Sequence, residues 1–435
     1  MEAVSLMKCP VCNLDVKRVL FQLDVPELFL SKLYESIIVL KCDSCNHIFN
    51  KISALEYEGI LSATNLNASG LKRVSAIAQQ SKGRVAKPVS SDYLDKQDLR
   101  SQDKSSSDFS KNLTHERAQQ TSEYILLHSN PNDKVLDIGC GKGGLLNYLS
   151  SMGYSNLYGI DRDTASIVEA KKAVETAIFF VGEAEKIPFK DSSFDLIVLD
   201  QVLEHLRWPL NAISEIFRVL KDDGKLVIGV PDVDRYDKHY FFEHYWFLMK
   251  GHIQHFGEQS LGNLLSKESF ELKDSKKVLT VLNSSMMTMP NLISLFEKRS
   301  REQNIEVQQL SKVDRFNIDS YLKDNRTRGT YIRQTIDKAV FSGKLLYCWG
   351  LSREFQYLMS NSNLYRANIK EIIDSDEFID SDSQDYKFDF PIRTPHFFGS
   401  GSSEELLLIT ATAHSVDIRS RAKRLGFQGE IISLR

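Results

Sequence analysis

No long run of apolar residues occurs in this sequence, and its charges nearly cancel. No segment approaches the roughly eighteen consecutive apolar residues of a membrane-spanning helix. The 55 lysines and arginines almost balance the 58 aspartates and glutamates, which leaves a net charge of −3. The sequence therefore lacks a basic field that would attract nucleic acid or an anionic membrane. We expect no membrane insertion and no nucleic-acid partner.

Residues 1–30 contain no basic segment followed by an apolar one, which is the pattern of a secretory signal peptide. Cysteine is also scarce, with 6 in 435 residues. Four of the 6 are spaced as metal ligands rather than as a disulfide framework. Such usage is typical of a reducing compartment, and we therefore expect a cytoplasmic protein.

Two C-x-x-C pairs lie near the N-terminus, and both have the spacing of metal ligands. Their members are Cys9, Cys12, Cys42 and Cys45. Four thiolates in a tetrahedron form a closed structural zinc site, whereas catalytic zinc keeps one position open. We therefore predict structural Zn²⁺ in a module that spans residues 1–62. His47 follows the second pair, and with four cysteines already present we predict that it is solvated rather than a ligand.

The rest of the chain is organised around residues 134–161, which read KVLDIGCGKGGLLNYLSSMGYSNLYGID. A short apolar strand leads into closely spaced glycines, an apolar helical face follows, and a second strand ends at Asp161. This order is typical of half a doubly wound sheet. Glycines without a Cβ let the backbone approach a ligand closely. Asp161, at the end of its strand, can accept hydrogen bonds from both hydroxyls of a ribose.

The D-x-G-x-G-x-G run that begins at Asp137 resembles motif I of the class I S-adenosylmethionine-dependent methyltransferases. Residues 182–189, GEAEKIPF, are similar to the family segment whose first acid faces the adenine amino group. Residues 200–206 are similar to the stretch that lines the cofactor and substrate mouth. The resemblance implies an α/β fold whose core is a doubly wound, seven-stranded, Rossmann-like sheet. A glycine-rich turn in another α/β protein is the alternative.

The resemblance also implies S-adenosylmethionine as cofactor and a small molecule as methyl acceptor. The implied cofactor-binding residues are Asp137, Gly139, Cys140, Gly141, Asp161, Arg162, Glu183, Ala184 and Asp200. Methyl transfer is a direct displacement, in which the protein mainly aligns the acceptor with the methyl carbon and excludes water. A base is needed only where the acceptor must lose a proton.

Histidines and aromatic residues gather after the fifth predicted strand, where a segment can cover the carboxyl ends of the strands. Residues 251–261, GHIQHFGEQSL, resemble the E-H-x-x-x-F-S-x-x-S-L stretch of sugar C-methyltransferases, with Gly251 in place of the glutamate. That resemblance makes His252 the candidate base, and His205 and His255 are further candidates for proton transfer. Two alternatives stay open: packing roles for the histidines, and an O-methyltransferase in which the H-x-x-x-F run is structural.

The two ends of the chain resemble the same group of enzymes, the zinc-containing sugar C-methyltransferases. The first end contributes the paired cysteines. The second is a smaller βα unit, with strands expected at 344–350, 369–373, 405–411 and 429–434 and a helix at 415–425. In those enzymes this unit contributes to nucleotide-sugar binding, so the resemblance implies a nucleotide-linked sugar as acceptor. O- or N-methylation of another small molecule or lipid is one alternative, and a non-catalytic zinc-ribbon scaffold is another.

We predict a division of the chain into five parts. They are a zinc-binding module at 1–62, a flexible linker at 63–112, the methyltransferase core at 113–300, a helical connector at 301–336 and a small Rossmann-like α/β domain at 337–435. At the start of the core, Thr114 is expected to cap a helix that runs through Leu127. Towards its end, residues 268–282 are expected to form the last strands, and residues 286–296 a connecting helix.

Overall fold

The structure is a computed structural model of the whole chain. It describes residues 7–24, 36–52, 57, 105–238, 248, 251–282, 287–300, 318–351, 355, 358–359, 361–374, 390–396 and 404–434. Most of the predicted linker and the aromatic run at 239–247 lie outside the described residues. Among those that are described, no helix is both long enough and apolar enough to cross a membrane.

A seven-stranded sheet forms the centre of the molecule, in the order β12-β13-β10-β9-β6-β7-β8. Its strands are β6 (Val135–Ile138), β7 (Leu157–Asp161), β8 (Ile178–Val181), β9 (Phe194–Asp200), β10 (Leu220–Pro231), β12 (Phe270–Leu282) and β13 (Met287–Lys298). Strands β6 to β10 pair in parallel, and β13 joins β10 in the antiparallel sense. The predicted doubly wound, Rossmann-like core is confirmed, and the two strands predicted within residues 134–161 are β6 and β7.

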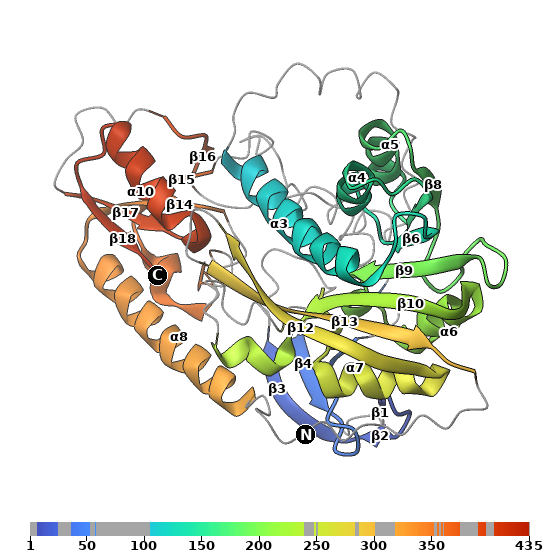
Figure 1. Cartoon of the computed structure of the whole chain (residues 1–435). Coiled ribbons are helices and arrows are strands. Elements are labelled where there is room, and N and C mark those ends of the chain that lie inside the picture. The colour runs from blue at the N-terminus through green and yellow to red at the C-terminus, as the bar shows by residue number, and fades with distance from the viewer. Residues whose placement is uncertain are drawn as a thin grey trace, which may run out of the picture.

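Helices cover both faces of this sheet (Figure 1). One face carries α3 (Ser105–His128), α4 (Gly144–Ser151) and α5 (Thr164–Ala173), and the other carries α6 (Pro209–Val219) and α7 (Glu258–Leu265). Local signals account for their starts: a proline opens α6, and the Asp163 carboxylate accepts the Ala165 and Ser166 amides at the start of α5. Helix α3 begins at Ser105, before the predicted cap at Thr114 and inside the predicted linker.

The connecting helix predicted at residues 286–296 is wrong, because residues 287–296 belong to strand β13. The strand lies between β10 and β12 and pairs with both. Residues 289–296 are buried on both faces of the strand, so the sequence lacks the regular apolar–polar alternation that marks a half-buried strand.

The N-terminal residues form a small sheet that the core completes. Its order is β11-β5-β4-β3, from β3 (Arg18–Asp24), β4 (Ser36–Lys41), β5 (Ile48–Lys51) and β11 (Gln254–His255), and a separate hairpin pairs β1 (Met7–Lys8) with β2 (Asp15–Val16). Strand β11 comes from the segment after the fifth core strand and pairs antiparallel with β5. The N-terminal module is therefore fixed to the core by a shared sheet.

His47 is buried in this junction, so the prediction that it is solvated is wrong. Its side chain is 0% exposed, and its Nε2 lies 2.9 Å from Oε1 of Gln254. The ring also packs on Phe49 and Phe256. His47 is buried because β11 packs beside β5 and covers a surface that would be exposed to solvent in the N-terminal module alone.

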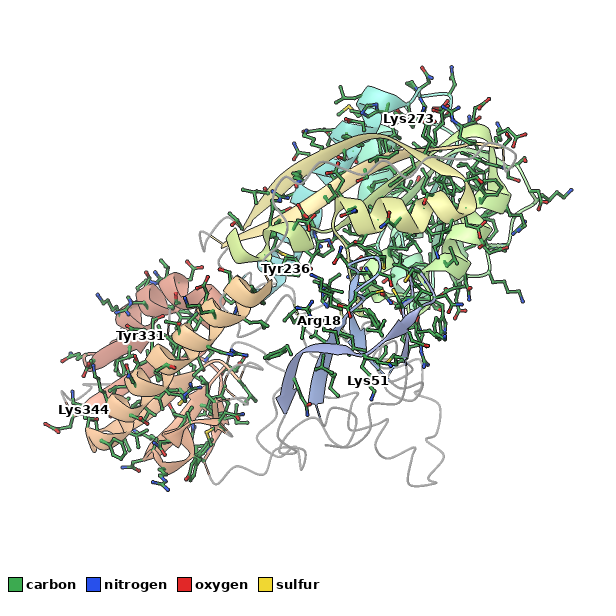
Figure 2. The ribbon with its side chains drawn as sticks, turned by 90° about the horizontal axis from the view of Figure 1, so that it is seen from below. Arg18, Lys51, Tyr236, Lys273, Tyr331 and Lys344 are labelled. Atoms are coloured by element: carbon green, nitrogen blue, oxygen red, sulfur yellow. The ribbon has the colours of Figure 1, made fainter. Side chains whose placement is uncertain are left out.

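The C-terminal residues form a second parallel sheet, in the order β16-β15-β14-β17-β18. The elements are α8 (Ile318–Phe341), β14 (Leu345–Trp349), β15 (Ile369–Ile373), β16 (Ile392–Arg393), β17 (Glu405–Ile409), α10 (Ser415–Arg424) and β18 (Glu430–Ser433). The four predicted strands and the helix are present, and β16 is an addition. Helix α8 runs from the core to this sheet, and Tyr236 lies where the two meet, its ring centroid 6.1 Å from that of Tyr321 (Figure 2).

Candidate functional site

The loop after β6 keeps its backbone bare at the carboxyl ends of the strands. Gly139 and Gly141 have φ of 74° and 50°, which L residues with a side chain rarely adopt. The Gly139 and Cys140 amides donate to the Ile160 carbonyl at 2.8 and 3.0 Å, which fixes the loop to β7. A Cβ on Gly139 would stand 2.2 Å from Cγ2 of Val202, whereas one on Gly141 would enter open space. The loop is therefore tight against the protein at its first glycine and open to a ligand at its second.

Asp161 ends β7 beside this loop and holds it in place. Its Oδ2 accepts the Gly141 amide at 2.9 Å, and its Oδ1 accepts the Asp163 amide at 2.8 Å. A carboxylate oxygen has two lone pairs, so each oxygen keeps one for a hydroxyl of a ligand. Arg162, the next residue and a predicted cofactor ligand, is exposed.

Three carboxyl groups, those of Asp137, Asp161 and Asp200, influence one another around the loop. Burial raises the pKa of Asp137 well above its usual value, and the charges of Asp200 and Asp161 raise it further. Burial also raises the pKa of Asp200, although Arg117 and a 3.2 Å hydrogen bond from the Thr121 hydroxyl oppose the shift. Crowded acids that resist ionisation favour a ligand that carries positive charge.

The predicted adenine-facing residues follow β8. Glu183 is exposed and bridges to Lys186 through the backbone, and Ala184 is buried at 7% exposure. Cys140 is also buried, and its Sγ lies 2.8 Å from where a Cβ on Gly159 would stand. Of the cofactor residues predicted from sequence, Asp137, Gly139, Gly141, Asp161 and Asp200 are drawn together most closely by the contacts above.

A second group of side chains, Glu204, His205 and His252, lies just beyond the end of β9. Glu204 and His205 are on a short 3₁₀ turn, η3 (Leu203–His205), and His252 comes from the segment before β11. The His205 and His252 ring centroids are 5.1 Å apart, and Nε2 of His205 is 3.9 Å from Oε1 of Glu204. One ligand atom from each of the three side chains lies within 4.8 Å of the others. The structure therefore brings together two of the three histidines that the sequence singled out.

Burial changes the ionisation of this group. It raises the pKa of Glu204 to about 8, with the Asp200 charge adding to the effect. Burial also lowers the pKa of His205, whose Nδ1 donates to the Gly251 carbonyl at 2.6 Å. The imidazole of His205 is thus held neutral, with the lone pair of Nε2 directed away from that carbonyl.

His255, the third candidate for proton transfer, occupies a packing position instead. It is 1% exposed on β11, and its Nε2 lies 3.2 Å from Oδ1 of Asn50. Burial lowers its pKa to about 3, and the nearby His47 adds to the shift. Among the described residues His255 is almost completely buried between the N-terminal sheet and the core, and this burial argues against the predicted catalytic role. The alternative of a packing role fits it better.

Sequence reasoning gave no individual role to two polar residues near Asp200, namely Arg117 and Gln201. Arg117 of α3 donates to Oε1 of Gln201 at 2.8 Å and lies near the Asp200 and Glu204 charges. Gln201 itself has φ of 57°, a strained value for a residue with a side chain, at the point where β9 ends. The sequence signal for Arg117 was only its place near the start of a helix, because its partners lie about 80 residues away in the chain.

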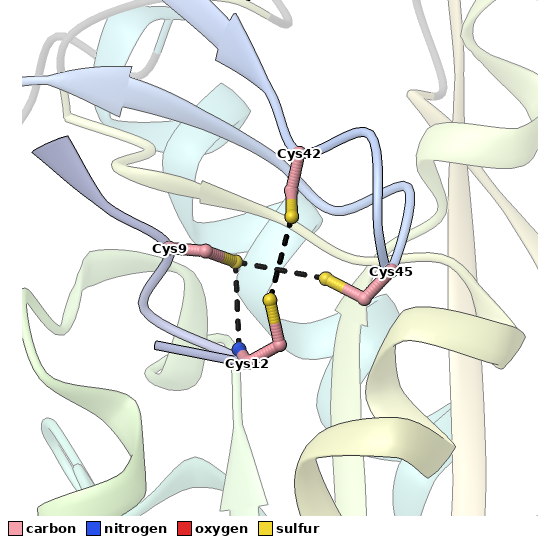
Figure 3. A group of neighbouring side chains, drawn as sticks. All are labelled: Cys9, Cys12, Cys42 and Cys45. Carbon is pink, nitrogen blue, oxygen red and sulfur yellow. Dashed lines mark hydrogen bonds between the residues drawn. The ribbon is translucent and has the colours of Figure 1, made fainter. Parts of the chain in front are cut away.

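The four paired cysteines converge as predicted (Figure 3). Sγ of Cys9 lies 3.6 Å from Sγ of Cys45, and Sγ of Cys12 lies 3.4 Å from Sγ of Cys42. A tetrahedron of Zn–S bonds of about 2.3 Å has edges of about 3.8 Å, so four thiolates here match Zn²⁺ after small shifts.

The two cysteine turns also share one backbone shape. Each ends on an asparagine with φ of 60°, Asn13 or Asn46, whose amide donates to the carbonyl of the first cysteine of its pair at 2.9 Å. Repeated geometry of this kind presents both pairs of sulfur atoms in the same way.

Asn50 and Gln254 connect the cysteine module to the group around His252. The Asn50 side-chain amide donates to the His252 carbonyl at 2.9 Å, and its main-chain amide donates to the Ile253 carbonyl at 2.8 Å. Gln254 contacts His47 through Oε1 and donates to the Leu206 carbonyl at 3.0 Å, just after His205. The module thus holds the backbone on both sides of the histidine pair.

Comparisons with known proteins identify the central part of the chain. Residues 110–274 match the family described as "Methyltransferase domain". An uncharacterized methyltransferase of Schizosaccharomyces pombe is 29% identical over 124 residues, which cover 26% of this chain and 45% of that protein. A ubiquinone/menaquinone biosynthesis C-methyltransferase of Roseobacter denitrificans is 29% identical over 102 residues, which cover 22% of this chain and 41% of that protein.

A solved S-adenosylmethionine-dependent methyltransferase of Methanosarcina mazei is 26% identical, with a TM-score of 0.35, and covers 40% of this chain and 96% of that one. The chain spans about a third to a half of the length of the curated relatives it matches. The predicted enzyme class, an S-adenosylmethionine-dependent methyltransferase, is confirmed for the core. The names of these relatives give no sugar acceptor.

Proposed function

We propose that this protein transfers a methyl group from S-adenosylmethionine to a small molecule at the carboxyl ends of β6, β7 and β9. The observation that carries the proposal is the crowding of Asp137, Asp161 and Asp200 around a bare glycine loop. S-adenosylmethionine is a nucleoside with a sulfonium charge and an amino group. Ribose hydroxyls suit the remaining lone pairs of Asp161, and positive charge suits the two acids that are difficult to ionise.

When bound, S-adenosylmethionine supplies a methyl carbon that is already activated by the sulfonium charge. The residues of the chain then have three tasks. The glycine loop and Asp161 fix the nucleoside, α3 shields the site from one side, and Glu204, His205 and His252 surround the acceptor. Where the acceptor gives up a proton, we assign that proton to the His205 and His252 pair, of which His252 is the candidate base. Alignment of this kind accounts for much of the rate in displacement reactions.

Proton release tests the cofactor site. Asp137 and Asp200 have raised pKa values, so they hold protons at a pH where such acids are ordinarily ionised. A cationic ligand favours their ionised forms, so binding should expel protons, and affinity should rise with pH. Calorimetry at one pH in buffers of different ionisation enthalpy should give binding heats that change with the buffer. S-adenosylhomocysteine, which lacks the sulfonium charge, should release fewer protons, and equal heats in every buffer would contradict the proposed electrostatics.

For the acceptor we propose a nucleotide-linked sugar, which the C-terminal sheet supports. Its strand order reverses between β14 and β17, and open parallel sheets bind ligands at such a point, beyond the carboxyl ends of the strands. Gly350 and Ala411 follow these two strands in close contact. Asp374 follows β15, and its Oδ2 accepts the Leu351 amide at 2.6 Å, as Asp161 accepts an amide of the core loop. The two sheets thus repeat one arrangement of strand end, loop and acid.

A panel of acceptors tests this second proposal. Incubation with S-adenosylmethionine should add one methylene in mass to a nucleotide-linked sugar and form S-adenosylhomocysteine. Replacing Asp374 by alanine should lower transfer to that acceptor at subsaturating concentration, while calorimetric binding of S-adenosylmethionine stays at the wild-type level. Free sugars, quinols and simple phenols serve as competing acceptors. Transfer to one of these and to none of the nucleotide-linked sugars would reject the sugar acceptor and retain the methyltransferase.

We also propose that the four cysteines hold Zn²⁺ in a structural role. Two observations support it: the sulfur separations suit tetrahedral Zn²⁺, and a closed set of four thiolates leaves no position for a substrate. The metal would stabilise a module whose own core is small, and through Asn50 and Gln254 it would stabilise the position of His252.

A further inference from the structure

The side chains of Glu204 and His205 face each other without a hydrogen bond between them. Nδ1 of His205 lies 2.6 Å from the Gly251 carbonyl oxygen, which can only accept, so the proton of the neutral ring is on Nδ1. Nε2 therefore presents a lone pair, and it does so 3.9 Å from Oε1 of Glu204. That separation is too long for a hydrogen bond. Two electron-pair donors at this distance leave room for a positive ion between them.

Glu204 is buried without compensation among the described residues. Its side chain is 1% exposed, and neither carboxylate oxygen has a hydrogen-bond partner there. The Arg117 charge acts on Glu204, but its guanidinium donates to Gln201 and forms no ion pair with Glu204 in the described part of the chain. A buried polar group that lacks a partner is costly to the fold, and native proteins retain one mainly where it has a function.

His252 is the third member of the group and comes from the segment before β11. Its ring centroid lies 5.1 Å from that of His205, and one ligand atom from each of the three residues falls within 4.8 Å of the others. Three points no more than 4.8 Å apart share a centre about 2.8 Å or less from each. Bonds of about 2.1 Å to nitrogen and oxygen then require side-chain shifts of less than about 1 Å.

We propose that Glu204, His205 and His252 bind a divalent first-row transition metal ion, separate from the Zn²⁺ proposed for the cysteines. Two imidazoles and one carboxylate favour Zn²⁺, Fe²⁺, Co²⁺ or Ni²⁺ over Mg²⁺ and Ca²⁺, which prefer oxygen ligands. A histidine that ligates a metal through one ring nitrogen usually donates a hydrogen bond from the other, and here the Gly251 carbonyl accepts that bond. It orients His205 and fixes which nitrogen is free.

This site deepens the methyl transfer proposed above and rests on it. Three protein ligands leave further positions on the ion open to an oxygen atom of the acceptor, whose proton becomes easier to remove. The proton passes to water at the mouth, the acceptor takes the methyl group, and the sulfonium becomes a neutral thioether. The two histidines then act as ligands, and they retain the role of proton acceptors only if no ion binds.

Cobalt binding to the full-length, zinc-loaded protein tests the site. Co²⁺ alone should bind with one additional equivalent per chain, and its visible spectrum should show nitrogen and oxygen ligands without new thiolate bands. Glu204→Gln keeps the shape of the side chain, and His252→Ala changes a partly exposed one. Each should weaken Co²⁺ binding at least about tenfold. His396→Ala, at a partly exposed histidine of the C-terminal residues, is the matched control and should leave binding unchanged.

Two results would overturn the metal site: no Co²⁺ bound beyond the cysteines, or bound Co²⁺ that Glu204→Gln and His252→Ala leave unaffected. Calorimetry with S-adenosylmethionine on the same samples separates this outcome from failure of the proposed function. If the protein binds S-adenosylmethionine but no additional Co²⁺, the proposed metal site is rejected and the proposed methyl transfer is retained. If the wild-type protein does not bind S-adenosylmethionine, the proposed methyl transfer is rejected.

Discussion

Replacing Gly139 by alanine should weaken the binding of S-adenosylmethionine roughly 100-fold. The new Cβ would stand 2.2 Å from Cγ2 of Val202, and the backbone φ of 74° is unfavourable for alanine. A strained backbone of this type costs about 1–3 kcal/mol, and an added contact in a filled space costs a similar amount. The loop would move to relieve the strain and the clash. If this movement costs about 3 kcal/mol of binding free energy, the affinity falls roughly 100-fold. Calorimetric titration measures the loss directly.

Gly153 provides the matched control for this substitution. It has φ of 91° in the turn after α4, and a Cβ there would meet nothing within 4 Å. Gly153→Ala therefore adds the same kind of backbone strain without the clash and far from the loop after β6. It should lower the melting temperature while leaving cofactor affinity unchanged. If Gly139→Ala folds and binds S-adenosylmethionine as the wild type does, the loop after β6 is not the cofactor cradle.

Removing Zn²⁺ from the cysteines should release the segment that carries His252. A structural zinc ion contributes about 10–16 kcal/mol of apparent binding energy to small modules, more than their cores supply. With Cys42 and Cys45 both replaced by serine, the sheet that pairs β5 with β11 should open. The contacts of Asn50 with the His252 and Ile253 carbonyls would be lost with it. Hydrogen exchange in residues 253–256 should accelerate by about 100-fold or more as this local structure opens.

Methyl transfer should fall with the same variant, because displacement of about 1 Å at a reacting centre costs roughly 100-fold in rate. Binding of S-adenosylmethionine should persist, since the cradle is built from β6, β7 and β9. Cys348→Ala is the control: this buried cysteine belongs to β14, outside the module, and its loss should leave residues 253–256 protected. If zinc is lost and hydrogen exchange at residues 253–256 is not faster, the metal does not stabilise the segment that carries His252.

Local patterns in the sequence were sufficient for the parallel strands and for the glycine loop. β6 and β9 are short, mainly apolar runs that end at a glycine or an acid. These end signals are local, so they do not depend on contacts with distant parts of the chain. The cysteine pairs were equally readable, because their spacing and the asparagine after each pair act within a few residues. The segment at 286–296 failed for the reason that makes β13 stable: a strand covered on both faces carries no alternating pattern.

The roles of the histidines were decided by contacts between distant parts of the chain. His47 and His255 are buried because β11 pairs with β5 across about 200 residues, and no pattern around either histidine reports that pairing. Glu204 likewise comes near Arg117 and His252 only when α3, η3 and the segment before β11 meet. The sequence by itself determined the glycine loop after β6 and the two cysteine pairs, since these depend on spacing along the chain. Only the tertiary structure decided which acids and histidines lie together beyond the ends of the strands, because their burial arises from packing between elements.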